Sequence, residues 1–330
     1  MLDDLKHHEE QNCIKDVAIG ASTVAIFLTA LTQYCGDIIK YNINEQTAYT
    51  FEGRYLYEVV INGTHEETTI DSRPIIMIDA GRQGGTEPVT LALFLIEQLV
   101  ACEENDEMIE KVQWIILPSA NPDGQEFNRV DTWRKNRRVS DNVLGIGVDI
   151  SRNFESQWGS CPKIESGFSP IYPGVGPVSE NETLFIKNLL LKYKKDIKVY
   201  LSIRRDGHAI LYPYGYTKNH PANSDRLIKV AANVAAKVNQ RAGGLSLFLN
   251  HSIYESEEKE RCGHSVDYAY DLGIPLAYEM RVFLGSNNLI MSKFHTLPRG
   301  YEASLRNGYY SGIRELYNII IKEKQYGRVY

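Results

Sequence analysis

The sequence lacks a surplus of positive charge. Its 36 Lys and Arg residues are outnumbered by 42 Asp and Glu residues, which gives a formal net charge of −6 at pH 7. Nucleic acids and anionic membrane surfaces bind basic patches, and no stretch of the chain forms one. The composition therefore argues against nucleic acid or an anionic membrane as the main partner.

Linkers rich in Pro, Gly or Ser, internal repeats and low-complexity tracts are also missing. The 330 residues are 43% hydrophobic and 24% charged, which is the composition of a globular protein long enough to bury a large core. Chain length alone does not divide such a sequence into two domains, because single α/β domains of this size are common.

Only one long stretch lacks formal charge, residues 17–35. It contains Gly20, Thr29 and Gln33 among other polar or small residues, which does not suit a membrane-spanning helix. We predict a mostly buried helix here and no membrane span. Residues 1–13 are acidic and contain histidine, unlike the basic start of a secretory signal.

Cysteines are few and none forms a C-x-x-C pair. The five are Cys13, Cys35, Cys102, Cys161 and Cys262. An odd number cannot all pair within one chain, so the cysteines decide neither the pairing nor the compartment. Glycosylation sequons at Asn62, Asn181 and Asn250 are compatible with secretion.

The chain does contain an alternation of two kinds of apolar segment. Short runs rich in β-branched or aromatic residues are typical of strands buried on both faces; they lie at 73–80, 112–118, 199–203 and 275–280. Stretches with helical periodicity lie at 87–104, 179–195, 224–241 and 301–324. This alternation predicts an α/β fold with helices on both faces of a sheet.

Three polar loops follow predicted strands, at 81–87, 119–128 and 204–209. In open α/β sheets, functional sites form outside the carboxyl ends of the strands. We therefore expect these loops to converge and to carry the chemistry of the protein.

The loops carry an ordered series of motifs: "IIMIDAG", "NPDG" followed by "WRKNRR", "GVDISRNF", "LYPYGYT" and "YEMR". In this order and spacing they resemble the zinc carboxypeptidase family of the carboxypeptidase A and B type, from about residue 22 to the end. The resemblance implies an N-terminal extension (1–21) and a single carboxypeptidase-like domain (22–330), with a mixed, mainly parallel eight-stranded twisted sheet. It also implies one zinc that polarises the scissile carbonyl and activates water, with a glutamate as general base.

The metal-binding positions depart from the family pattern. Gln83 stands at the position of the family's first metal-binding histidine, and Arg204 at the position of the second. Glu87 corresponds to the metal-binding glutamate, but one extra residue precedes it. An amide oxygen is a weak zinc ligand, and a guanidinium has no lone pair to donate. His208 could be considered as a substitute ligand, but it lies four residues beyond Arg204, about 13 Å along an extended chain, which is too far for a small shift in alignment. We therefore predict a pseudoenzyme without zinc or another cofactor, which serves as a binding or structural module.

Arg204 also indicates what replaced the metal. Two carboxylates match the site, Glu87 and Glu279, and the latter stands at the position of the general base. Without a cation they would repel each other or take up a proton. We predict that the planar guanidinium of Arg204 pairs with them, and the alternative is that it points into solvent.

Several substrate-binding positions match the family. The resemblance assigns Arg134 to the oxyanion, Arg152 to the C-terminal carboxylate of the substrate, and Tyr254 to the mobile tyrosine that closes over it. Ser151 replaces the asparagine that shares this carboxylate, and Val266 matches the base of the side-chain pocket, where an apolar residue implies hydrophobic C-termini. Peptide or protein C-termini are thus the predicted ligands. The alternatives are that the arginines knit loops together and that Val266 packs in the core.

Two other functions remain open. An active metallocarboxypeptidase that cleaves hydrophobic C-terminal residues would need Glu87, His208 or His264 to bind zinc through an unusual loop, and segment 255–264 is longer than in the family. A serine hydrolase would use Ser265, which no G-x-S-x-G motif surrounds. The "GRQGG" segment lacks the Lys-Ser/Thr of a phosphate-binding P-loop. The resemblance favours secretion, an intracellular role stays open, and the oligomeric state is not predicted.

Overall fold

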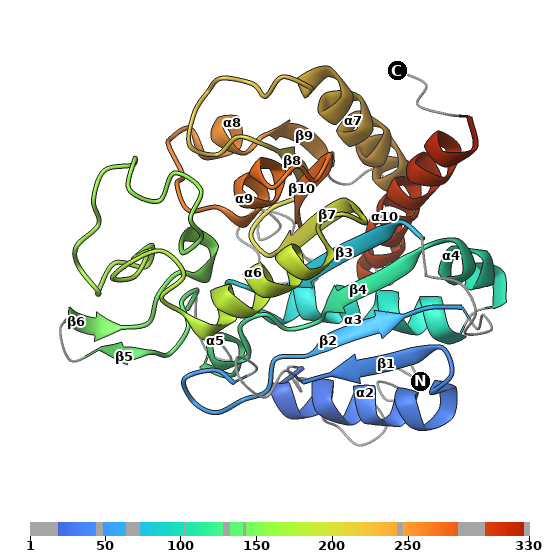
Figure 1. The fold of residues 1–330 in the computed structure, drawn as a ribbon, viewed down its shortest axis with the longest axis horizontal. Coiled ribbons are helices and arrows are strands. Elements are labelled where there is room, and N and C mark those ends of the chain that lie inside the picture. The colour runs from blue at the N-terminus through green and yellow to red at the C-terminus, as the bar shows by residue number, and fades with distance from the viewer. Residues whose placement is uncertain are drawn as a thin grey trace.

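An eight-stranded sheet forms the centre of the molecule (Figure 1). The computed structural model describes residues 19–43, 49–63, 73–101, 103–127, 133–140, 143–242, 247–282 and 301–326. In the order of the sheet, the strands are β1 (Ile39–Asn42), β2 (Glu58–Ile61), β4 (Gln113–Leu117), β3 (Ile75–Ala80), β7 (Ile197–Arg204), β10 (Leu276–Arg281), β8 (Ala209–Tyr212) and β9 (Leu249–Ser252).

The sheet mixes parallel and antiparallel pairs. The central strands β4, β3, β7 and β10 run parallel, as do β8 and β9. The pairs β1–β2, β2–β4 and β8–β10 are antiparallel. This arrangement confirms the predicted mixed, mainly parallel sheet.

The central strands are buried on both faces because helices cover both sides of the sheet. Every residue of β3 and β10 is buried, and in β7 only Lys198 is exposed. Their uninterrupted apolar runs predicted this burial, since no polar face had to be kept for solvent.

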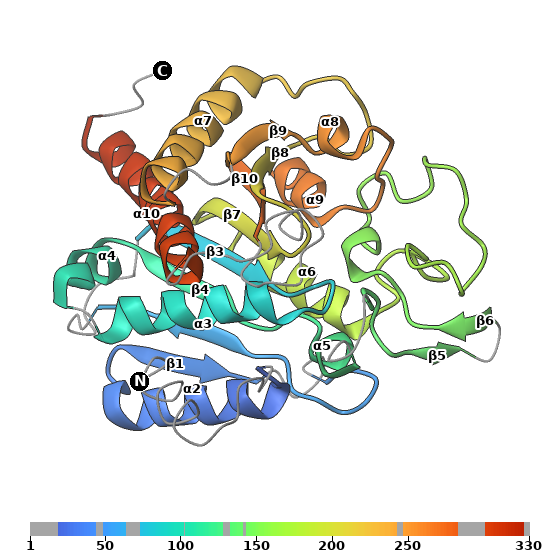
Figure 2. The same cartoon turned by 180° about the vertical axis from the view of Figure 1, so that it is seen from behind.

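Two layers of helices enclose the sheet, as Figures 1 and 2 show from opposite sides. One layer contains α2 (Ala21–Cys35), α3 (Thr86–Ala101), α7 (Ser224–Arg241) and α10 (Tyr301–Tyr326), and the other contains α6 (Asn181–Tyr193) and α9 (Ser265–Asp271). Shorter elements are η1 (Glu103–Asn105), α4 (Asp106–Lys111), α5 (Pro122–Phe127), η2 (Ile150–Arg152), α8 (Ile253–Glu257) and the hairpin of β5 (Val139–Ser140) and β6 (Val143–Ile146). Each layer buries its own hydrophobic cluster against the sheet, which confirms the α/β prediction.

Helix α2 is less buried than its uncharged sequence predicted. Only the stripe of Val24, Phe27, Leu28 and Leu31 is buried, at the spacing of one helix face. Tyr34 is 80% exposed. Among the described helices, none has the length and hydropathy needed to cross a membrane. Residues 1–18 of the predicted extension lie outside the described part of the chain.

The three polar loops converge at the carboxyl ends of the central strands. The side chain of Asn121 donates a hydrogen bond to the carbonyl of Arg82 (3.0 Å), and a Cβ on Gly85 would lie 2.7 Å from Cδ of Arg205 in the third loop. Gly84 permits the close approach, because it has a φ of +61° and a Cβ there would lie 2.9 Å from the carbonyl oxygen of Gly124. The predicted meeting of the loops is confirmed.

A long irregular segment, residues 153–180, lies beside this end of the sheet. Asn153 holds it by donating hydrogen bonds to the carbonyls of Pro173 and Gly176. A disulfide joins Cys161 of this segment to Cys262, which precedes α9. Cys35 is free, and Cys13 and Cys102 lie outside the described residues.

Candidate functional site

Arg204, the last residue of β7, reaches the carboxylate of Glu279 on the neighbouring strand β10. Its Nη1 lies 3.1 Å from Glu279 Oε1 and 3.7 Å from Oε1 of Glu257 on α8. Side chains alternate along a strand, so Glu279 and Arg281 leave β10 on the same face, and Arg204 leaves β7 on that face too. Arg204 is only 4% exposed, which excludes the alternative that it points into solvent.

The predicted contact of Arg204 with Glu87 is wrong. Glu87 lies half-buried in the first turn of α3, beside the side chain of Arg205: a Cβ on Gly85 would meet Glu87 Oε2 at 3.2 Å and Arg205 Cδ at 2.7 Å. The second carboxylate at Arg204 is instead Glu257. The residue inserted before Glu87 moves this carboxylate away from the ends of β7 and β10.

Glu279 is fully buried and surrounded by cations. Its Oε1 accepts from Arg281 Nε (2.7 Å) as well as from Arg204, and its Oε2 lies 3.6 Å from Arg261 Nη1. Burial alone raises the pKa of this carboxyl, but the three guanidinium charges overcome it and hold the pKa well below its usual value. A general base needs a pKa near the working pH and a free lone pair. In this structure Glu279 is the shared counter-ion of Arg204, Arg261 and Arg281.

His264 completes the shell around Glu279. Its Nδ1 accepts the N–H of Val266 (3.1 Å), so the proton sits on Nε2, which donates to Glu279 Oε2 (2.8 Å). Burial and the neighbouring charge of Arg261 lower the pKa of His264 to about 3. Both ring nitrogens are thus engaged, and the ring has no lone pair left for a metal.

His208 lies on the opposite face of the sheet. Its Nδ1 is 2.7 Å from the hydroxyl of Tyr309 on α10, and its ring packs against Phe248 with centroids 5.0 Å apart. Phe248 and Tyr309 belong to the hydrophobic cluster that α7 and α10 cover. Val266, whose N–H donates to His264, belongs to the cluster on the other face of the sheet, which α6 and α9 cover. His208 therefore cannot join Glu279 in one site.

The residues at the three metal positions do not fit zinc. Gln83 is buried and its Nε2 donates to Ser151 Oγ (3.1 Å), which leaves only a neutral amide oxygen, a weak zinc ligand. Arg204 offers no lone pair, and Glu87 faces another loop. Across the described residues, no group of three or more His, Cys, Asp and Glu side chains is arranged to bind a metal.

Ser151, Arg134 and Arg152 meet around one buried carboxylate, Asp149. Arg134 Nε lies 3.7 Å and Arg152 Nε 3.6 Å from Asp149 Oδ2, and Ser151 Oγ donates to Oδ1 (2.5 Å). Burial raises the pKa of Asp149, but the arginine charges outweigh burial and lower it. The structure thus gives both arginines a carboxylate partner within the chain, as the loop-knitting alternative expected.

A sequence profile described as zinc carboxypeptidase matches residues 25–304. The chain belongs to the zinc carboxypeptidase family. Carboxypeptidase B of Helicoverpa zea is 32% identical over 249 residues, which cover 70% of this chain and 55% of the relative. Mast cell carboxypeptidase A of Rattus norvegicus is 28% identical over 239 residues, covering 65% and 57%. This chain thus spans little more than half the length of these relatives.

Solved structures confirm the carboxypeptidase fold. Bovine thrombin-activatable fibrinolysis inhibitor in complex with tick carboxypeptidase inhibitor superposes with a TM-score of 0.81 at 20% identity, over 93% of this chain and 98% of the other. Carboxypeptidase A from Helicoverpa armigera gives 0.77 at 24% identity, over 95% and 79%. At these identities the likeness shows the fold alone.

Arg261 is one of three site residues that the sequence analysis did not name, together with Glu257 and Arg281. Its guanidinium is fully buried between Ser151, Glu257 and Glu279, with Nη2 donating to Ser151 Oγ (2.7 Å) and Nη1 3.2 Å from Glu257 Oε1. Burial lowers the pKa of Arg261 to about 10, which still leaves it charged at neutral pH. The unusual length of segment 255–264 was the only signal for it.

The ion-paired cluster carries more positive than negative groups. Its cations are Arg82, Arg134, Arg152, Arg204, Arg261 and Arg281, and its anions are Asp79, Asp149, Glu257 and Glu279. His264 is neutral at pH 7. The cluster therefore has two guanidinium charges more than carboxylate charges, and this environment favours an anion.

Two further family positions, Tyr254 and Val266, lie outside the ion-paired contacts around Glu279. Tyr254 is half-buried on α8 and its N–H donates to the carbonyl of Tyr214 (3.1 Å). Val266 is fully buried in the hydrophobic cluster that α6 and α9 cover. Ser265 is also fully buried, which closes it to a substrate as a nucleophile.

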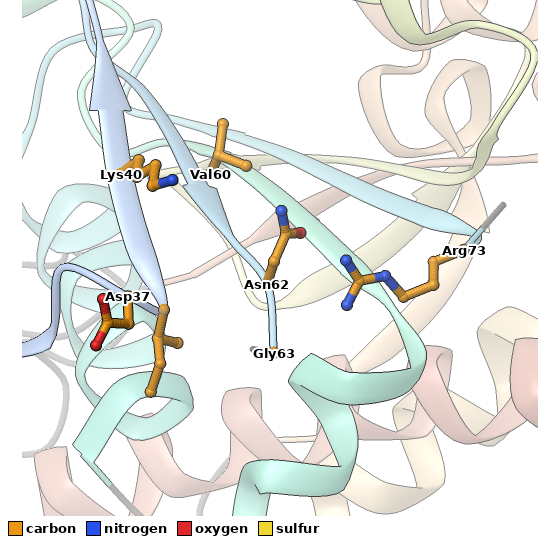
Figure 3. Close-up of a pocket in the computed structure, with 7 residues that line it drawn as sticks. Asp37, Lys40, Val60, Asn62, Gly63 and Arg73 are labelled. Carbon is orange, nitrogen blue, oxygen red and sulfur yellow. The ribbon is translucent and has the colours of Figure 1, made fainter. Parts of the chain in front are cut away.

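A cavity of about 340 Å³ lies at the other end of the sheet (Figure 3). Asp37, Lys40, Asn62 and Arg73 line it, next to the amino end of β3. It is therefore separate from the carboxyl ends of the strands, where Arg204 and Glu279 lie.

Proposed function

We propose that this protein is a catalytically inactive member of the zinc carboxypeptidase family. The observation that carries the proposal is the contact between Arg204, at the position of a metal histidine, and Glu279, at the position of the general base (3.1 Å). A guanidinium cannot bind zinc, so neither carbonyl polarisation nor water activation has a source. Glu279 would have no metal-held water to deprotonate.

Zinc content tests this proposal. The purified protein is incubated with zinc, freed of excess metal and analysed for its elements, with carboxypeptidase A as a control that keeps its metal. We expect far less than one zinc per chain. Stoichiometric zinc, together with chelator-sensitive release of C-terminal Phe or Leu, would instead establish the alternative of an active metallocarboxypeptidase.

We further propose a role as a binding module for peptide C-termini. Two observations support it: the cationic excess of the cluster, and the position of Arg134, whose side chain is 25% exposed beside Asp149. Peptides ending in Phe, with a free or an amidated C-terminus, would be compared by calorimetry on the oxidised protein and again after its reduction with dithiothreitol. Preferential binding of the free carboxylate that Arg134→Ala weakens supports the role, and equal binding of both peptides contradicts it.

We also propose that the protein is secreted. Its disulfide between Cys161 and Cys262 suits an oxidising compartment, and Asn181 of one sequon is exposed. Expression in secretory cells should give a species in the medium whose mass falls on treatment with an N-glycosidase. Retention of the whole product inside the cells contradicts this assignment.

A further inference from the structure

Arg261 occupies the space between the two ends of the family's substrate site. Ser151 stands at the position of the carboxylate anchor and Glu279 at that of the general base. The guanidinium of Arg261 touches both, at 2.7 Å from Ser151 Oγ and 3.6 Å from Glu279 Oε2, and is fully buried. A peptide C-terminus can therefore enter only when this side chain leaves.

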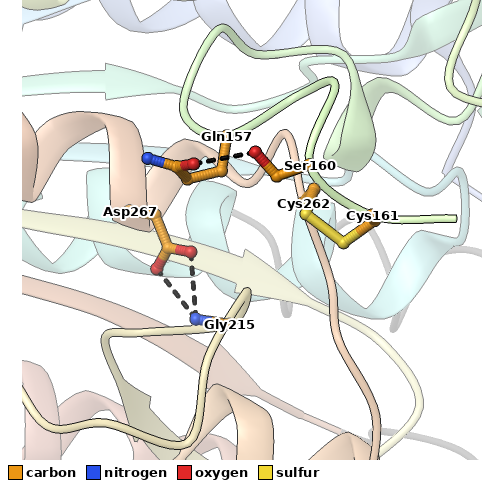
Figure 4. The surroundings of a disulfide bond; sticks show 6 residues. All are labelled: Gln157, Ser160, Cys161, Gly215, Cys262 and Asp267. Carbon is orange, nitrogen blue, oxygen red and sulfur yellow. Dashed lines mark hydrogen bonds between the residues drawn. A yellow bond between two sulfur atoms is a disulfide. The ribbon is translucent and has the colours of Figure 1, made fainter.

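The backbone on either side of Arg261 is tied to its surroundings by hydrogen bonds. The Arg261 N–H donates to the carbonyl of Gly215 (2.8 Å), and the N–H of Gly215 in turn donates to Asp267 (Figure 4). On the other side, the N–H of Gly263 donates to the carbonyl of Ser156 (2.9 Å). Gly263 has a φ of +70°, and a Cβ there would lie 2.1 Å from the carbonyl oxygen of Arg152, so the segment fits closely against its neighbours.

A disulfide bond next to Arg261 also holds this segment in place. Cys262 is bonded to Cys161, which lies 101 residues earlier in the irregular segment beside the site (Figure 4). Cys161 is half-buried between exposed residues, whereas Cys262 is buried, so a small reductant would approach the bond from the side of Cys161. Arg261 shares Glu279 and Glu257 with Arg204, and these two like charges repel each other.

We propose that Arg261 is a built-in occupant of the cleft and that the disulfide between Cys161 and Cys262 holds it there, so that reduction by a dithiol opens the cleft. The thiolate of the dithiol attacks one sulfur and forms a mixed disulfide, and its second thiol then displaces that bond. The products are two cysteine thiols and a cyclic disulfide of the reductant. This inference rests on the proposed binding role, since it concerns access to that same site.

Chemical modification of arginine tests the proposal without any ligand. The protein is treated with phenylglyoxal before and after reduction with dithiothreitol, and the modification of each arginine is read by peptide mass spectrometry. Arg82 is the internal control, because it is 1% exposed and its ion pair with Asp79 ties it to β3 and not to the segment that carries the disulfide. The double variant Cys161→Ser, Cys262→Ser is treated in parallel without reductant.

We expect modification of Arg261 to rise several-fold on reduction and in the double variant, while Arg82 stays protected. If Arg261 remains as protected as Arg82 after reduction, the disulfide does not hold it and the proposal is overturned. If Arg82 reacts together with Arg261, reduction unfolds the domain as a whole, which also overturns it. This measurement uses neither zinc nor a peptide. A negative result for the disulfide and Arg261 can therefore be told apart from a negative result for the proposed loss of zinc chemistry.

Discussion

The guanidinium of Arg204 lies 3.1 Å from the carboxylate of Glu279, and both side chains are shielded from solvent. The pair joins the carboxyl ends of β7 and β10 at the position where the family pattern places a metal ligand and a general base. We propose that this fixed charge takes the place of the metal ion of the family pattern. The stability of this end of the sheet should depend on it.

Arg204→Ala should lower the free energy of unfolding by about 3 kcal/mol, because it leaves a buried carboxylate short of one partner. Urea unfolding at pH 7 measures the change. The matched control is Arg226→Ala, which removes the partly exposed ion pair with Glu323 and should cost about 1 kcal/mol or less. Equal losses of unfolding free energy in the two variants would show that the buried pair stabilises the protein no more than the pair of Arg226 with Glu323.

Acid should destabilise the protein through His264. Its pKa is about 3 in the fold and about 6.5 in the unfolded chain, so below pH 6.5 the unfolded state binds the extra proton. Stability from this group is complete above pH 6.5 and is lost as the pH falls towards 3. His264→Asn keeps a helix-capping side chain but does not titrate, so its unfolding free energy should vary less between pH 6.5 and 4. An unchanged slope would assign the acid sensitivity to other groups.

Alkali should destabilise the protein through Asp267. Burial raises its pKa to about 8, so the folded state keeps a proton that the unfolded chain has lost above about pH 4. The contribution is complete below pH 4 and disappears as the pH rises through about 8. Asp267→Asn retains an acceptor for the N–H of Gly215 and should lose less stability than the parent between pH 6 and 9, as followed by thermal unfolding. Glu182, whose pKa is also raised to about 8, leaves a residual slope that Glu182→Gln should remove.

Arg261→Ala should leave a site that is complementary to a guanidinium, formed by Ser151, Glu257 and Glu279. Methylguanidinium at millimolar concentration should raise the melting temperature of this variant and leave that of the parent unchanged. Methylammonium is the matched control, because it carries the same charge without the planar fork of donors. Equal effects of the two cations would show that the site does not select the shape of Arg261.

The fold was open to prediction because its strands are buried on both faces and therefore have continuous apolar runs, as at Ile75–Ala80 and Leu276–Arg281. The contact of Arg204 with Glu279 was predictable too, since both stand at motif positions on neighbouring strands. Glu87 was misplaced because one inserted residue changes the direction in which the first turn of α3 presents it. That shift depends on the loop path and not on residue type.

Arg261 and Glu257 could not be found in the same way. They lie in segment 255–264, which is longer than in the family pattern, and their contacts depend on how that segment folds back. The contact of Arg281 with Glu279 could have been predicted from the sequence, because a residue two positions after Glu279 on a strand must lie on the same face. The pairing of Cys161 with Cys262 depends on the same fold-back, since 101 residues separate them.

The buried contacts of Glu279 also affect how the sequence can evolve. Three guanidinium groups and one imidazole now satisfy this carboxylate. Changing Arg204 back to histidine would remove one of its cations while Gln83 still occupied the other metal position, so the intermediate would lose stability before it could gain a metal. We therefore expect that single substitutions in this ion cluster would not readily produce a metal site.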